Sequence, residues 1–191
     1  MNKKWTPEQH DDEDRLLVVL LISRNKDNRD LPGFRPRTRS FLAYEDDTRI
    51  QNEWSQFLTE AAPGELCRLY VSVNARDIEA IRKQLLYALI FENPSLTHID
   101  QLLASIAARK ECASEHRWMF DFDSTNETLL NKFLSDLESV FAREKIQTHP
   151  TPHGHAVIVP HGFDTRQLMS DYPCVTLKRD GMLCREFKTI P

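Results

Sequence analysis

The chain has 191 residues, which suits one domain or one domain with a modest extension. Hydrophobic residues make up 40% and charged residues 28%, a composition typical of a soluble globular protein. The net charge of −4 argues against a general DNA-coating protein, which would carry a basic surplus. It is compatible with a nucleotide pocket or a short basic groove.

The first elements in chain order predict a soluble protein. Residues 1–14 read as a flexible acidic arm, and 15–191 as a single domain. The apolar run 16–22 is too short to span a bilayer, and an acidic run precedes it, unlike in a signal peptide. We interpret it as a buried strand. No partner in a membrane is expected.

Four scattered cysteines favour a reduced, cytoplasmic compartment, because none forms a Cys-x-x-Cys pair and a free buried thiol is the usual interpretation. They are Cys67, Cys112, Cys174 and Cys184.

The remaining elements alternate between the period of a strand and the period of a helix. Residues 24–37 read as a long exposed loop, the most positive stretch of the chain. Further strands are expected at 40–44, 66–73, 118–122, 155–159, 175–178 and 182–187. Helices are expected at 48–62, 77–91, 96–108 and 126–144, with capping boxes at Thr48 and Ser124, and a short helix follows Asp164.

This pattern predicts an α+β fold with a mainly antiparallel sheet and helices packed on one face. The last two strands flank the turn Arg179-Asp180-Gly181, so they read as a terminal hairpin.

The most informative motif is the aromatic run 117–123, which ends in Asp121 and Asp123. On a strand these carboxylates share a face, with Cα atoms about 6–7 Å apart, and they suit a hard divalent cation such as Mg²⁺ or Mn²⁺. The alternative is a solvated strand end beside a helix N-terminus. Asp180 is either a third metal ligand or a turn former.

A second motif, Thr151-Pro152-His153-Gly154-His155, is a turn that opens an apolar strand. Gly154 lets a phosphate or another backbone approach closely. His155 is expected within roughly 4–8 Å of Asp121 and Asp123. The neighbouring histidines lack the partners of common zinc sites and are expected on a surface turn.

Arg68 and Tyr70 lie on the polar face of the 66–73 strand. They are either ordinary strand residues or, if they face the aspartates, a phosphate ligand and a base-stacking ring.

These residues resemble the archaeo-eukaryotic primase superfamily, which includes primase-polymerases, over about residues 115–160. Asp121 and Asp123 match its first motif, and the segment Thr151 to His155 stands where the family has its second. The resemblance implies a primase-like or RRM-like core that acts in DNA replication, carboxylates that bind catalytic Mg²⁺ or Mn²⁺, and a histidine that contacts nucleotide phosphates. Asp180, or less plausibly Asp164, would supply the third acidic motif. The chain also resembles small phage or mobile-element proteins in general character.

Three functions therefore stay open. The first is metal-dependent nucleotidyl or phosphoryl transfer on nucleotides or nucleic acid, with Asp121, Asp123 and His155 as catalytic residues. The second is a non-catalytic nucleotide- or RNA-binding module that uses Arg68, Tyr70, Thr151, Gly154 and His155. The third is a phage-type factor that binds a protein partner.

Overall fold

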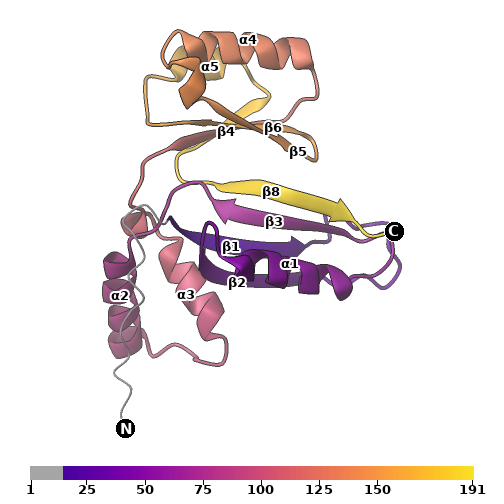
Figure 1. Cartoon of the computed structure of the whole chain (residues 1–191), viewed down its shortest axis with the longest axis vertical. Helices are drawn as coiled ribbons and strands as arrows, with labels where there is room; N and C mark the ends of the chain where they lie inside the picture. The colour runs from indigo at the N-terminus through magenta and orange to yellow at the C-terminus, as the bar shows by residue number, and fades with distance from the viewer. Residues whose placement is uncertain (1–14) are drawn as a thin grey trace.

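The computed structural model describes residues 15–191; the predicted arm at 1–14 lies outside the described residues. Two four-stranded antiparallel sheets, ordered β2-β1-β3-β8 and β5-β6-β4-β7, replace the single sheet that the sequence predicted (Figure 1). The α+β class and the antiparallel pairing are confirmed, whereas the expectation of one sheet was wrong.

The first sheet consists of β1 (Leu16–Ser23), β2 (Arg37–Tyr44), β3 (Leu66–Ser72) and β8 (Met182–Thr189). Its helical elements are α1 (Thr48–Thr59), α2 (Ile78–Tyr87), the π-helical turn η1 (Ala88–Glu92), α3 (Ile99–Ala107) and the short 3₁₀ turn η2 (Lys110–Cys112).

Strand β1 is apolar along its length because both of its faces are buried. Leu17 and Val19 pack in the same core as Trp54 of α1, while Leu16 and Val18 join a second core with α2 and α3. A strand covered on both sides has no solvent face that needs polar side chains. The sequence interpretation of 16–22 as a buried strand is confirmed.

The second sheet consists of β4 (Trp118–Phe122), β5 (Gln147–Thr151), β6 (Gly154–Val159) and β7 (Val175–Lys178). Its helices are α4 (Glu127–Glu138), α5 (Arg166–Asp171) and the short turn η3 (Arg143–Lys145). Phe120 and Phe122 pack against Phe133 of α4. Helices α4 and α5 thus cover one face of this sheet, and its other face turns toward the first sheet (Figure 1).

Helix starts were predicted to within a few residues, but two caps differ. Asp77 caps α2 as expected, and its carboxylate accepts from two backbone amides. Asp47 caps α1 in place of Thr48, and Asn126 caps α4 in place of Ser124. In each case the side chain nearest the amides at the actual helix start takes the role.

The predicted terminal hairpin was wrong. Strand β7 pairs with β4 in the second sheet, and β8 pairs with β3 in the first, so the chain crosses between the sheets at Arg179–Gly181. The sequence analysis also missed strand β5, which contains Pro150 and lies at a sheet edge, where a proline is tolerated.

Candidate functional site

A small cavity of about 100 Å³ lies where the two sheets face each other. Asp121 of β4 and Asp123, the residue directly after β4, line it, and β3 contributes Arg68 and Tyr70. The other lining groups come from the loop after β1, the β5–β6 turn, and strands β6, β7 and β8. The cavity therefore gathers polar side chains from both halves of the molecule.

Asp121 and Asp123 share the face of β4 that turns away from α4, as the strand parity predicted. Phe120, which precedes Asp121, and Phe122, which lies between the two aspartates, are fully buried on the α4 side. The side chain of Asp121 is 26% exposed. Asp123 is exposed, and its carboxylate has no hydrogen-bond or ion-pair partner within residues 15–191. One carboxylate is thus half-buried and the other is free to take a ligand.

Lys178 supplies the only ion-pair partner of Asp121 in the described part of the chain. It lies directly opposite Met119 in the β4–β7 ladder, so it shares the face of Asp121 two residues along. Its Nζ donates to Asp121 Oδ2. A diagonal pair of this kind is within reach of a long side chain across neighbouring strands.

Arg68 and Tyr70 form the opposite wall, on the other sheet. Arg68 is only 4% exposed; its Nη2 donates to Asp27 at 2.6 Å and its Nη1 to the Tyr70 hydroxyl at 3.3 Å. Arg68 Nε is buried and has no hydrogen-bond partner within residues 15–191. A buried guanidinium with an unused donor is suited to bind an anionic group that enters the cavity.

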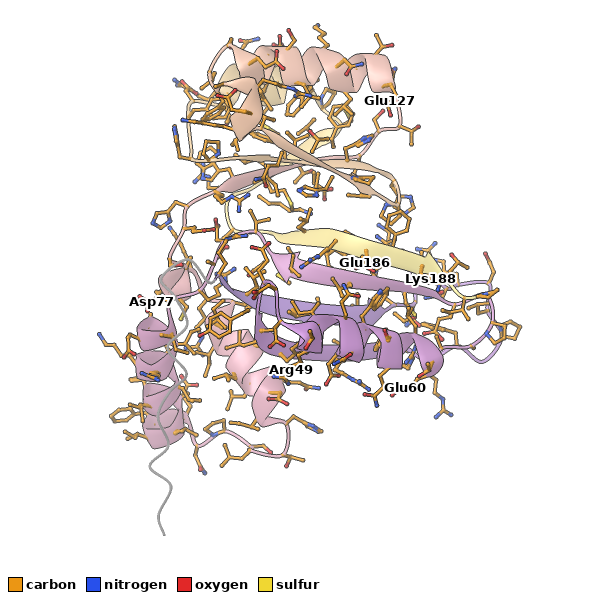
Figure 2. All side chains as sticks on the ribbon, in the orientation of Figure 1. Arg49, Glu60, Asp77, Glu127, Glu186 and Lys188 are labelled. Carbon is orange, nitrogen blue, oxygen red and sulfur yellow. The ribbon has the colours of Figure 1, made fainter. Side chains whose placement is uncertain are left out.

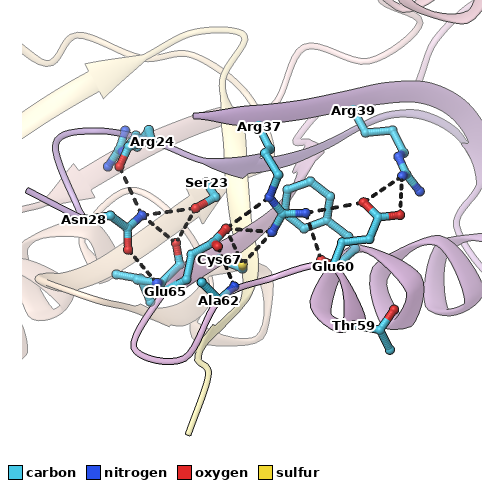
Figure 3. A network of polar contacts seen from close by, with 12 residues as sticks. Ser23, Arg24, Asn28, Arg37, Arg39, Thr59, Glu60, Ala62, Glu65 and Cys67 are labelled. Carbon is cyan, nitrogen blue, oxygen red and sulfur yellow. Dashed lines mark hydrogen bonds and ion pairs between the residues drawn. The ribbon is translucent and has the colours of Figure 1, made fainter. Parts of the chain in front are cut away.

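The loop after β1 is exposed over most of its length, as the sequence suggested, but it is anchored at Asn28. Asn28 is 3% exposed, and it bonds through its amide to Ser23 and through both amide atoms to the backbone of Leu66 (Figure 3). This anchor holds Arg24 and Lys26 at the cavity.

Asp27, on the same loop, links the two arginines of this wall. Burial alone would raise the pKa of the Asp27 carboxyl, but hydrogen bonds from Arg24 and the positive charge of Arg68 outweigh it, and the pKa lies below its ordinary value. Asp27 therefore stays ionised and holds Arg68 in place.

Many arginines of the positive stretch are neutralised. Strand β2 starts at Arg37, earlier than predicted. Arg37 pairs with Glu65 and Glu60, and Arg39 pairs with Glu60 (Figure 3). Arg39 also pairs with Glu53. Lys26, which has no partner in the structure described, is the free cation of this loop that reaches the cavity.

His155 is not beside the carboxylates. It pairs with Phe122 in the ladder, so its side chain lies on the α4 face, opposite to that of Asp121, which pairs with Ala156. Its Nε2 is 3.9 Å from a carboxylate oxygen of Glu127, the first residue of α4 (Figure 2). The expected cluster of two aspartates and His155 is therefore not formed, because His155 lies opposite Phe122 in the β4–β6 ladder and shares its face, not that of Asp121.

The turn between β5 and β6 brings a different histidine to the cavity. Thr151, Pro152 and His153 line it, and His153 is exposed. Gly154 allows the close approach of another backbone segment, the second of the two roles that the sequence suggested. An added Cβ would lie 2.0 Å from the carbonyl oxygen of Phe122. The absence of a side chain at Gly154 thus lets the backbone at the end of β4 pack against it. The histidine of this turn that lines the cavity, and so could contact a phosphate, is His153.

Asp180 belongs to a separate cluster, which we call the junction: Asn74, Arg76, Glu115, Arg117 and Asp180. Both oxygens of Asp180 accept from Arg76 at 2.9 Å, and Oδ1 also accepts from Asn74 at 3.1 Å. Asp180 does not line the cavity. As a metal ligand beside Asp121 and Asp123 it is misplaced, and its role is to hold the crossing between the sheets.

Two other hollows are larger, at about 240 and 480 Å³. Their acids are already paired: Glu53 with Arg39 and Asp100 with Arg49 in one, and Glu115 with Arg15 in the other. The smaller cavity is the better candidate site because the Asp123 carboxylate, which has no partner among the described residues, lines it.

Within residues 15–191, no three His, Cys, Asp or Glu side chains are grouped so that they could hold a metal ion by themselves. Mg²⁺ sites in nucleotide enzymes commonly use only one or two carboxylates, and substrate phosphates and waters supply the rest. Lys178 already places a positive charge against Asp121. Asp121 and Asp123 would supply two carboxylates to such an ion, and Asp121 is shared with Lys178 in this structure.

The chain matches no protein-family model, no curated protein and no solved structure. None of the helices in the described residues has the length and apolar character needed to cross a membrane.

The sequence analysis missed Lys178, Lys26, His153 and Cys184 as cavity residues. Cys184 lies beside Tyr70; burial raises the pKa of its thiol, and so, more weakly, does the charge of Asp121. No local signal identifies these residues, because their placement depends on which strands pair and on how the two sheets face each other.

Proposed function

We propose that this chain carries out metal-dependent nucleotidyl or phosphoryl transfer on nucleotides or nucleic acid. One observation carries the proposal: Asp121 and Asp123 of the second sheet and Arg68 and Tyr70 of the first line the same cavity. Two acids for a cation, a buried guanidinium for a phosphate and an aromatic ring for a base are the groups that this chemistry needs.

Each residue has a role that follows from its position. Asp121 and Asp123 would hold Mg²⁺ or Mn²⁺, which neutralises phosphate charge when bound. Arg68 and Lys26 bind phosphate oxygens, and Arg68 is held in place by Asp27. Tyr70 offers its ring to a base. His153 and Thr151 can donate hydrogen bonds to phosphate from the β5–β6 turn. The primase-like core that the sequence motifs suggest is part of this proposal through Asp121 and Asp123, whereas His155 of the second motif lies on the α4 face of the sheet.

A second candidate is a non-catalytic nucleotide- or RNA-binding module. It is favoured by two contacts: Lys178 pairs with Asp121, and Asp180 is bound to Arg76. In this reading Lys178 occupies one of the carboxylates that a catalytic cation would need, and Asp180 is not available as a third acid. Such a cavity can bind an anionic ligand without catalysing a reaction on it.

Comparison of wild type with Asp121→Asn separates these functions. We expect Mn²⁺-dependent incorporation or hydrolysis of a labelled nucleoside triphosphate by the wild type, and a loss of about 10³-fold or more in the variant, because asparagine keeps the shape and removes a charge that the cation needs. Asp164→Asn, at an exposed acid outside the cavity, is the control. Thermal melts of all three proteins check the fold.

Equal rates in wild type and Asp121→Asn would contradict the catalytic proposal. A wild type that binds nucleotide but is inactive with every metal and nucleotide would support the binding module.

A further inference from the structure

Lys178 has no assigned task in the proposed reaction, yet it makes the closest contact of any basic group with the acidic pair. Its ammonium donates to Asp121 Oδ2, while the neighbouring Asp123 stays unpaired within the described chain. The side chain of Lys178 is 42% exposed, so it has room to move. It comes from β7 and extends over the face of β4 that lines the cavity.

We propose that Lys178 is the resident counter-ion of Asp121, that a divalent cation displaces it, and that the released ammonium then binds the nucleotide phosphate. This inference rests on the proposed function and deepens it. Lys178 thus acts as a positioning residue that couples cation binding at Asp121 to phosphate binding in the same cavity.

The exchange follows from charge and geometry. A single ammonium can neutralise Asp121, but it leaves Asp123 without a partner; a divalent cation can use both carboxylates. A metal ion on Asp121 and the Lys178 ammonium would repel each other at short range, so entry of the metal favours movement of Lys178 away from Asp121. The flexible stem of lysine lets its point charge follow the phosphate that arrives with the metal.

The other charged groups that line the cavity do not offer the same exchange. Arg68 and Arg24 are both held by Asp27, and Arg68 is almost wholly buried. Lys26 is free but comes from the opposite wall of the cavity, as part of the first sheet's loop. Lys178 is therefore the lining cation whose partner is one of the two proposed metal ligands.

The test uses the full chain with Lys178→Met, which keeps the length of the side chain and removes its charge. Lys188→Met is the matched control, since Lys188 is an exposed β8 lysine outside the cavity (Figure 2). Binding of Mn²⁺ alone is measured by the electron-paramagnetic-resonance signal of the free ion. Binding of a non-hydrolysable nucleoside triphosphate in saturating Mn²⁺ is measured by calorimetry.

We expect Lys178→Met to bind Mn²⁺ alone at least about tenfold more tightly than wild type, because the competing charge is gone. We expect the same variant to bind the Mn²⁺–nucleotide complex about tenfold more weakly, because one phosphate contact is lost. Lys188→Met should match wild type in both. Opposite changes in the two affinities are not produced by a lysine that only stabilises the fold.

Wild type that binds Mn²⁺ while Lys178→Met binds it no more tightly would overturn the exchange and leave the proposed function standing. If neither protein binds Mn²⁺, with or without nucleotide, both the proposed metal-dependent function and the exchange are wrong. Binding by Lys178→Met but not by wild type would support both, with lysine as the stronger competitor.

Discussion

The cavity and the junction are both clusters of acids and bases between the same two sheets, but their carboxylates differ. Asp180 in the junction accepts three hydrogen bonds from fixed donors of the chain. In the cavity, Asp121 is paired with a half-exposed lysine and Asp123 with no described residue. Arg76 and Arg68 are alike, because each is buried and its Nε has no hydrogen-bond partner in the part of the chain that the structure describes.

The comparison teaches that the number of hydrogen bonds the carboxylate accepts, and not the burial of the arginine, distinguishes a structural cluster from a candidate site. A carboxylate bonded on both oxygens to buried donors stabilises the fold, and removing its partner leaves a partly buried charge without a counter-ion. A carboxylate with an exchangeable partner, or none, costs little to alter and is available to a ligand. Substitutions in the junction should therefore destabilise the fold more than substitutions of the acids that line the cavity.

The largest effect on stability is expected at the junction. Arg76→Ala leaves Asp180 without its main partner at a position where Arg76 is only 5% exposed, and we expect a loss of about 3–5 kcal/mol in the free energy of unfolding. Urea denaturation followed by circular dichroism measures it. Arg82→Ala, at an exposed pair with Glu79, is the control and should cost at most about 1 kcal/mol. Similar losses at the two arginines would break the comparison.

A smaller effect on stability is expected at Gly154, where β6 packs closely against the end of β4. The methyl group of Gly154→Ala would overlap the Phe122 carbonyl, so we expect a loss of about 1–3 kcal/mol, with displacement of the strand that carries Asp121. Gly33→Ala is the control: its Cβ meets no atom within 4 Å, and the cost comes only from its φ of +72°. We expect about 1 kcal/mol there. The same melting temperature for both variants would show that the close approach does not matter.

The smallest effect on stability is expected at Asp27, whose carboxylate binds Arg24 and Arg68 at one wall of the cavity, and it should depend on pH. The pKa of Asp27 is lowered in the folded protein, despite burial that raises it, by Arg24 and Arg68. A lowered pKa stabilises the fold above the ordinary carboxyl value of 3.8, and this contribution is lost as the pH falls from there through the folded pKa.

Asp27→Asn should therefore lose about 1 kcal/mol near pH 7 and less below pH 4, since asparagine keeps a neutral hydrogen bond in place of a charged one. The measurement is the free energy of unfolding from pH 7 to pH 3 for both proteins. A constant difference between them across this range would show that Asp27 ionisation does not support the wall.

Local patterns were enough to predict the class of fold and the face of the acidic pair. Alternation along 117–123 placed Asp121 and Asp123 opposite to Phe120 and Phe122, and the structure agrees. Period-3.6 segments located α1, α2, α3 and α4 with errors mainly at the ends. These features depend on side chains a few residues apart, which a sequence displays directly.

Long-range pairing could not be predicted in the same way. The turn at Arg179–Gly181 suits a hairpin, but β7 and β8 find partners in different sheets. The sequence analysis expected His155 near the aspartates because it follows the Gly154 turn. The register between β4 and β6 instead pairs His155 with Phe122, so that its side chain faces α4. Lys178 meets Asp121 only because β7 pairs with β4. Such choices depend on the sum of contacts across two sheets.

The most direct test of the central claim is whether the unsatisfied acid of the cavity binds a divalent cation together with nucleotide. Mn²⁺ binding is measured by electron paramagnetic resonance, with a saturating non-hydrolysable nucleoside triphosphate, for wild type, Asp123→Asn and the exposed control Asp164→Asn. We predict that Asp123→Asn weakens binding at least about tenfold with an unchanged melting temperature, and that Asp164→Asn matches wild type. Equal Mn²⁺ affinity in wild type and Asp123→Asn would contradict the account.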